Sequence, residues 1–147
     1  MILYLDTSSL VKLYVEESGT PETERLVDEA LLVCTSVVAY AEARSALARL
    51  RREQKLSEEE HEFAKADLDE DWPRYLALDV TREVWHAAGN LAERHALRGF
   101  DSIHLASLLH LTHTDLGEPV QFSSFDDHLN GAVRAETGEA LVCEDVE

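Results

Sequence analysis

The chain has few cysteines and no long apolar run, and each shortage excludes a class of protein. Its two cysteines, Cys34 and Cys143, lie far apart in apolar surroundings without CxxC spacing, which indicates buried, reduced thiols. No apolar run approaches the roughly 18 residues of a membrane-spanning helix, so we expect no membrane segment. The N-terminus has neither the basic region nor the apolar core of a signal peptide, and we therefore expect a cytoplasmic protein.

Basic residues are scarce relative to acidic ones. Thirteen Lys and Arg stand against thirty Asp and Glu, a formal net charge of −17, and only three of the basic residues are lysines. Nucleic-acid-binding proteins usually carry a basic footprint, and a field this negative repels polyanions. The charge indicates either a solvated acidic surface or adaptation to high salt, which also screens repulsion. A nucleic-acid partner therefore requires local arginine clusters.

The length and the apolar pattern indicate one globular α/β domain over residues 1–147. Strands are predicted at residues 2–5, 31–35, 75–78, 120–123 and 140–143, and helices at 10–15, 22–29, 36–53, 57–71, 81–95, 102–113 and 126–134. Strands that alternate with helices are typical of a parallel sheet with helices on both faces. The helices over 36–53 and 57–71 are expected to form a projecting hairpin.

Four acidic residues lie close to the ends of the predicted strands. Asp6 directly follows the first strand, and Glu42 lies in the second turn of the helix after the second strand. Asp101 and Asp126 begin later helices, although Asp126 taken alone is as well explained as a helix cap. Because parallel strands end at the same edge of a sheet, where α/β proteins keep their ligand crevice, we expect the four acids to gather there.

Four gathered carboxylates pose an electrostatic problem. Two unit charges about 4 Å apart repel by roughly 4 kcal/mol at an effective dielectric constant of 20. Either their protonation shifts or a cation lies among them. Oxygen ligands without His or Cys favour Mg²⁺ or Mn²⁺ over zinc, and a water on such an ion can attack phosphorus. The acids therefore predict a site for Mg²⁺ or Mn²⁺.

In four ordered segments the chain resembles the PIN domain family of metal-dependent ribonucleases. The segments are Leu5-Asp6-Thr-Ser-Ser-Leu10-Val-Lys-Leu-Tyr14, Thr35-Ser36 with Glu42, Arg98-Gly-Phe-Asp101-Ser-Ile-His-Leu-Ala106, and Ser123-Ser-Phe-Asp126-Asp-His-Leu129. The small size without an appended domain resembles VapC-type toxins of toxin–antitoxin modules. The resemblance implies a three-layer sandwich, a four-acid Mg²⁺ or Mn²⁺ pocket, cleavage of single-stranded RNA, a homodimer and an antitoxin partner that blocks the pocket.

The resemblance also assigns roles to single residues. It implies catalytic and metal-binding roles for all four acids, Asp6, Glu42, Asp101 and Asp126. Ser8 and Ser124 match small polar positions beside the first and fourth acids and are candidates for contacts to water or phosphate. Asp127 adjoins the fourth acid and is a second candidate for its role.

Several other side chains have two interpretations. Arg49 follows Glu42 by seven residues, on nearly the same helix face, and either holds a flanking phosphate or pairs with an acid. Arg52, at the end of that helix, is explained by the helix dipole.

Two residue groups outside the acids also need an interpretation. His104 follows Asp101 by one turn and either orients that acid or packs in the core. Trp85 with Leu91 is expected to form an apolar face for a dimer.

Our hypothesis from the sequence is a Mg²⁺- or Mn²⁺-dependent endoribonuclease that acts as the toxin of a toxin–antitoxin pair. Asp6 is the central ligand and Asp101 the second, while Glu42 and Asp126 complete the site and one of them accepts a proton from the attacking water. One alternative is a catalytically silent PIN-like binding or regulatory module, which the acidic surface favours. A receiver-type phosphoacceptor is disfavoured because Asp6 stands alone, without the acid pair expected after the first strand.

Overall fold

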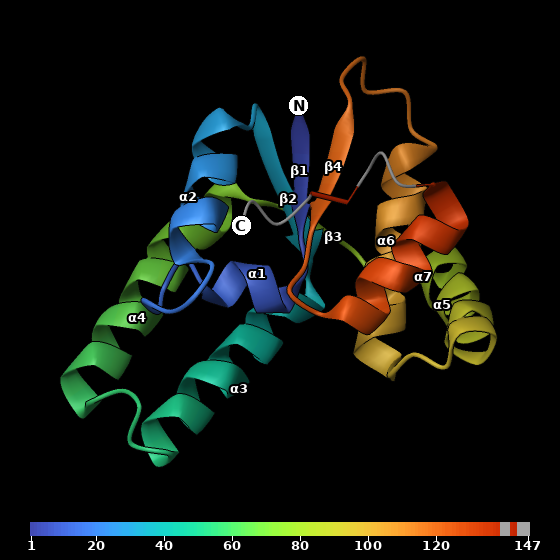
Figure 1. The fold of residues 1–147 in the computed structure, drawn as a ribbon. Coiled ribbons are helices and arrows are strands. Elements are labelled where there is room, and N and C mark those ends of the chain that lie inside the picture. Colours follow the sequence, from blue (N-terminus) through green and yellow to red (C-terminus); the bar gives the residue numbers. More distant parts are fainter. Residues whose placement is uncertain (139–141, 144–147) are drawn as a thin grey trace.

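A parallel four-stranded sheet lies at the centre of the molecule (Figure 1). The computed structural model describes residues 1–138 and 142–143. The strands are β1 (Ile2–Leu5), β2 (Leu32–Ser36), β3 (Leu76–Leu78) and β4 (Val120–Ser123), in the spatial order β3-β2-β1-β4. Of the strand predicted at 140–143, Val142 forms a parallel bridge with Phe122, and residues 140 and 141 lie outside the described part.

Helices cover both faces of the sheet. They are α1 (Thr7–Val11), α2 (Thr20–Glu29), α3 (Val38–Arg52), α4 (Glu58–Asp71), the short 3₁₀ segment η1 (Trp72–Arg74), α5 (Arg82–His95), α6 (Gly99–Thr112) and α7 (Asp127–Thr137). Helices α1 to α4 lie on one side and α5 to α7 on the other (Figure 1), which confirms the three-layer α/β sandwich. None of these helices has the length and apolarity that crossing a membrane requires.

The central strand β1 supplies both halves of the core. Its four residues are all buried, as expected for an apolar run between two helical layers. Successive side chains of a strand point to opposite faces. Ile2 and Tyr4 therefore pack against α5, α6 and α7, whereas Leu3 and Leu5 pack against α1 to α4. The strand is thereby fixed on both faces, and so is the position of the residue that follows it.

Two predicted helix starts are wrong, and local hydrogen bonding explains both. Helix α1 begins at Thr7 and not at Leu10, because the side chain of Asp6 caps it by accepting a hydrogen bond from the Ser9 amide. Helix α6 begins at Gly99 and not at residue 102. The Ser102 amide donates to the Arg98 carbonyl at 3.0 Å and the Ser102 hydroxyl donates to the Gly99 carbonyl at 2.6 Å, so residues 99–101 already belong to the first turn.

Helices α3 and α4 form the predicted projecting hairpin (Figure 1). The start of α4 has a capping box, in which the Ser57 hydroxyl accepts from the Glu60 amide and the Glu60 carboxylate accepts from the Ser57 amide, both at 3.0 Å. Leu47 of α3 and Leu68 of α4 are buried in the same core cluster. The cap thus stabilises a helix that holds α3 in place.

The predicted apolar dimer face is wrong, because only one of its two residues is exposed. Trp85 is 53% exposed on α5, but Leu91 is buried in the core against the sheet. The two residues therefore do not share one exposed surface. A homodimer stays a prediction, without this face as its basis.

We predict that Ser57→Ala lowers the free energy of unfolding by about 1 kcal/mol, because it removes an N-cap acceptor from an exposed helix start. Urea denaturation followed by circular dichroism measures the change. Ser57→Thr, which keeps the hydroxyl, should stay close to wild type. An Ala variant as stable as wild type would show that the cap does not support the hairpin.

Candidate active site

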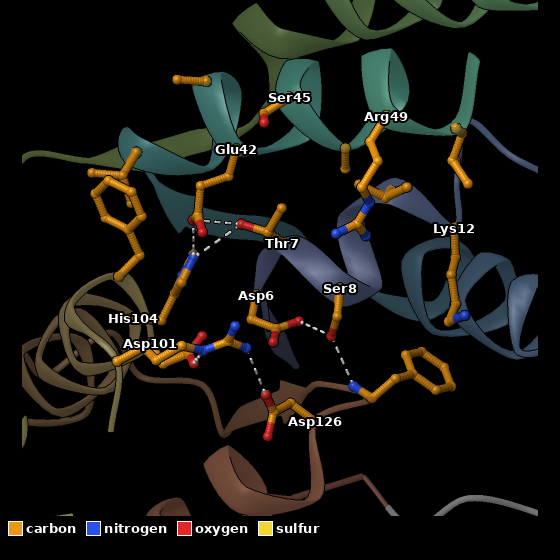
Figure 2. Close-up of a pocket in the computed structure, with 18 of the residues that line it drawn as sticks. Asp6, Thr7, Ser8, Lys12, Glu42, Ser45, Arg49, Asp101, His104 and Asp126 are labelled. Carbon is orange, nitrogen blue, oxygen red and sulfur yellow. Dashed lines mark hydrogen bonds and ion pairs between the residues drawn. The ribbon is translucent and has the colours of Figure 1, made fainter. Parts of the chain in front are cut away.

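All four predicted acids line one cavity of about 700 Å³ at the carboxyl edge of the sheet (Figure 2). Asp6 follows β1, and Glu42 projects from α3. Asp101 lies in the first turn of α6, and Asp126 is the N-cap of α7. The prediction that these acids gather at one edge of the sheet is confirmed.

Asp6 is the most deeply buried of the four, with 3% of its surface exposed. Its Oδ1 accepts from the Ser8 hydroxyl at 2.7 Å and from the Ser9 amide at 3.0 Å, and its Oδ2 accepts from the Ser124 hydroxyl at 2.6 Å. The Ser124 hydroxyl in turn accepts from the Asp126 amide at 3.0 Å. The hydroxyls of Ser8 and Ser124 therefore hold Asp6, and a contact of either with water or phosphate stays a prediction.

Glu42 is held by hydrogen bonds at a single carboxylate oxygen. Its Oε1 accepts from the Thr7 hydroxyl at 2.7 Å and lies 2.9 Å from Nε2 of His104, as Figure 2 shows. Burial raises the pKa of Glu42, but the hydrogen bonds from His104 and Thr7 outweigh it and hold the pKa below its ordinary value. The carboxylate is therefore kept ionised.

His104 does more than pack, and it does not orient the acid that precedes it. The ring is buried with 1% exposed, and its Nε2 contacts Glu42, whereas Nδ1 contacts the Tyr4 hydroxyl at 2.9 Å. Orientation of Asp101, one of the two predicted roles, is therefore wrong. A clue was available in the sequence: Tyr4 places a hydroxyl in the otherwise aliphatic run Ile2–Leu5, and a buried hydroxyl needs a partner.

Asp101 and Asp126 share a cation that sequence reasoning did not identify. The Arg98 Nε lies 3.5 Å from Asp101, and a terminal nitrogen of the same guanidinium lies 3.9 Å from Asp126. The Arg98 side chain is 87% exposed, so this is a weak, solvent-screened ion pair. Asp127 is exposed and does not line the cavity, which leaves Asp126 as the fourth acid of the site.

The buried end of the cavity carries more negative charge than its surroundings compensate. Burial raises the pKa of Asp6 despite its three hydrogen bonds. Burial, and next the charge of Asp126, raise the pKa of Asp101. Raised pKa values of this kind are typical of sites where buried carboxylates lack a compensating positive charge.

The donor chemistry of the cavity fits a hard divalent cation. Among the described residues, five carboxylates line it, the four predicted acids and Glu17, which pairs with Lys12. No cysteine of the described part lines it, and its one histidine is bonded at both ring nitrogens. In the conformation described, no three His, Cys, Asp or Glu side chains among residues 1–138 and 142–143 already surround one point. The positive charge beside Asp101 and Asp126 comes instead from Arg98.

Helix α3 turns one face toward the cavity along most of its length. Glu42, Ser45, Arg49 and Arg52 all line the cavity and are spaced by three, four and three residues. Figure 2 shows the first three of them on this face. Within the described residues neither Arg49 nor Arg52 has a carboxylate within 4.0 Å, so the predicted pairing of Arg49 with an acid is not formed. Arg52 also faces the cavity, so the helix dipole is an incomplete explanation of its position.

Comparison with known proteins agrees with this geometry. The family model of the PIN domain matches residues 3–114. Ribonuclease VapC45 of Mycobacterium tuberculosis strain CDC 1551 and ribonuclease VapC49 of strain H37Rv are each 39% identical to the chain over 108 residues. The alignment covers 74% of this chain and 75% of each relative.

Solved structures show the same fold at low sequence identity. Mycobacterium tuberculosis VapC20, a sarcin-ricin loop cleaving toxin, superposes with a TM-score of 0.66 at 17% identity, over 88% of this chain and 94% of its own. FitAcB of Neisseria gonorrhoeae gives 0.67 at 18% identity, over 90% and 93% of the two chains. A toxin–antitoxin complex of Klebsiella pneumoniae gives 0.61 at 13% identity, over 97% and 96%. The strand order, the gathered acids and these matches lead to one assignment: the chain belongs to the PIN domain family.

Proposed function

We propose that this protein is an endoribonuclease that hydrolyses phosphodiester bonds of RNA and is the toxin of a toxin–antitoxin pair. The observation that carries the proposal is the cavity in which four acids gather, in a PIN domain whose 39% identical relatives are ribonucleases. The likeness of the fold to a toxin–antitoxin complex supports an antitoxin partner. The acidic net charge favours a catalytically silent module, but the known relatives give that alternative no support. Membership of the PIN family replaces the receiver-type alternative.

The proposed cofactor is Mg²⁺ or Mn²⁺, held by Asp6, Glu42, Asp101 and Asp126. When bound, such an ion lowers the pKa of a water molecule and stabilises the charge that develops on the phosphoryl oxygens. The residues of the chain hold the carboxylates that would bind the ion. Asp6 is fixed by its three donors, and Glu42 stays ionised. Glu42 or Asp126 would accept the proton from the attacking water.

The basic face of α3 provides the proposed contacts to RNA. Seven residues of helix span about 10 Å, so Arg49 lies within reach of a phosphate that flanks one held near Glu42. Arg52 extends this face by one further turn. Phe100, which lines the cavity and is 55% exposed, offers an aromatic surface on which a base can stack. These local contacts allow a chain of net charge −17 to bind a polyanion.

A cytoplasmic location and a homodimer complete the proposal. The location is an expectation from the sequence, and the homodimer is what the family resemblance implies. Sedimentation analysis of the purified protein measures the oligomeric state directly.

We predict that Asp6→Asn and Asp101→Asn each reduce metal-dependent cleavage of labelled single-stranded RNA at least about 100-fold, because each removes a carboxylate from the reacting centre. EDTA should abolish cleavage by wild type. Asp127→Asn, the adjacent acid outside the cavity, is the matched control and should stay within about twofold of wild type. Equal cleavage by Asp6→Asn and wild type would assign the activity to a contaminant. Absence of cleavage by folded protein in every metal and salt condition would favour a binding module instead.

We also predict that Asp6→Asn stabilises the metal-free protein by about 1 kcal/mol at pH 7. The pKa of Asp6 is raised on folding, so its ionised form costs stability above the folded pKa, and that cost is relieved as the pH falls through it. The gain from Asn should therefore shrink as the pH approaches about 4, the ordinary pKa of aspartate. Urea denaturation at pH 4 to 8 checks this. If Asp6→Asn is less stable than wild type at every pH, the buried charge of Asp6 does not destabilise the metal-free protein.

For the α3 face, we predict that Arg49→Ala raises the KM for RNA about five- to tenfold with little change in kcat, because it removes a phosphate contact outside the reacting centre. The slope of binding against salt concentration should also fall by about 0.7 in log–log units. Arg44→Ala is the control, since Arg44 bonds the Tyr40 hydroxyl and does not line the cavity. Equal effects of Arg49→Ala and Arg44→Ala would show that Arg49 acts only through the net charge of the protein and makes no specific contact to RNA.

A further inference from the structure

A continuous chain of hydrogen bonds runs from the core of the molecule to Glu42. The Tyr4 hydroxyl lies 2.9 Å from Nδ1 of His104, and Nε2 of the same ring lies 2.9 Å from Oε1 of Glu42. The Thr7 hydroxyl donates to the same oxygen at 2.7 Å and lies 3.1 Å from Nε2 of His104 (Figure 2). The chain thus joins β1, α1 and α6 to a side chain of α3.

The two inner members of this chain have no freedom to move. Tyr4 and His104 are almost completely buried, and their rings meet edge to face with centroids 5.9 Å apart. Phe122 lies against the tyrosine ring, also at 5.9 Å. Because an unpaired buried polar group costs about 1–3 kcal/mol, the imidazole is held in the one orientation that satisfies both of its nitrogens.

The position of every hydrogen in the chain follows from the donors and acceptors present. The Glu42 carboxylate can only accept, so the ring nitrogen that faces it at 2.9 Å, Nε2, carries a hydrogen, and Nδ1 accepts from the Tyr4 hydroxyl. A neutral imidazole that accepts at Nδ1 carries its hydrogen on Nε2. This Nε2–H then donates to Glu42, which receives a second hydrogen bond from Thr7 at the same oxygen. Among the described residues no hydrogen bond reaches Oε2 of Glu42, which leaves that oxygen available to the cavity.

We propose that His104, fixed as the Nε2–H tautomer by Tyr4, is a positioning residue that together with Thr7 holds Glu42 with one oxygen anchored and the other turned to the cavity. The inference rests on the proposed function in assigning Glu42 to the reacting centre. Glu42 sits on a half-exposed helix face with three rotatable bonds, so without these donors it would sample several rotamers. Ligands oriented by such outer hydrogen bonds typically lose 10- to 100-fold in metal affinity or activity when the bonds are removed.

The first test is spectroscopic and independent of RNA cleavage. Long-range ¹H–¹⁵N correlation of the metal-free protein labelled with ¹⁵N-histidine reports which ring nitrogen carries the hydrogen, and His104→Gln identifies the signal. We expect a protonated Nε2 and an unprotonated Nδ1. A hydrogen on Nδ1 alone would overturn the proposal.

The second test measures Mn²⁺ binding by electron paramagnetic resonance of the free ion. His104→Leu removes both hydrogen bonds at similar volume and should weaken Mn²⁺ binding 10- to 100-fold, whereas His104→Gln, which keeps a donor near the Nε2 position, should restore most of the affinity. Thr7→Val and Thr7→Ser form a second pair at a less buried position, with the same expected order. The proposal is overturned if the Mn²⁺ affinity is equal within both pairs, the two His104 variants and the two Thr7 variants. Residues that only pack would give the same affinity whether or not the variant keeps a hydrogen-bond donor.

Cleavage assays then separate this inference from the proposed function. A reduced kcat with an unchanged KM for RNA in His104→Leu and Thr7→Val supports the positioning role. Wild-type cleavage by both variants overturns the positioning role and leaves the nuclease intact. If wild type cleaves no RNA, the proposed function fails, and the tautomer and the Mn²⁺ affinities decide the positioning of Glu42 on their own.

Discussion

The burial of one carboxylate at the end of the central strand is the constraint on which the site depends. β1 is fixed on both faces by the core, so Asp6 has one possible position, and its charge is buried there. Hydrogen bonds from Ser8, Ser9 and Ser124 hold the carboxylate without removing the cost of its charge. The fold therefore maintains a destabilised group where a cation would relieve it, the usual trade between stability and activity.

The charge distribution resolves the conflict between an acidic chain and a polyanionic substrate. The net charge of −17 belongs to the whole chain, whereas the cavity has one acidic part and one basic part. Its buried end holds the four acids, and one face of α3 adds Arg49 and Arg52 about two and three turns beyond Glu42. A phosphodiester chain meets positive charge along this face, and a divalent cation at the acids would neutralise part of the negative charge of the remaining part. Recognition then depends on local geometry more than on net charge.

Features that depend on neighbouring residues could be predicted from the sequence, whereas contacts between residues far apart in the chain could not. Apolar runs and turn residues located the sheet and its order of elements, and the rule that parallel strands end together brought Asp6 and Asp126 to one edge. The contact of Tyr4 with His104 joins residues one hundred positions apart, and no local pattern encodes it. The start of α1 differs from the predicted residue 10 because the side chain of Asp6 caps the helix and brings Thr7, Ser8 and Ser9 into its first turn.

The central claim is that the four acids form a divalent-metal site for hydrolysis of RNA. Anomalous diffraction from crystals containing Mn²⁺ at pH 7 or above tests it most directly. The account predicts an anomalous peak in this cavity, coordinated by Asp6 and at least one further acid of the four, and its loss in Asp6→Asn. A wild-type protein that cleaves RNA while its cavity shows no peak, or shows one that does not involve Asp6, would contradict it.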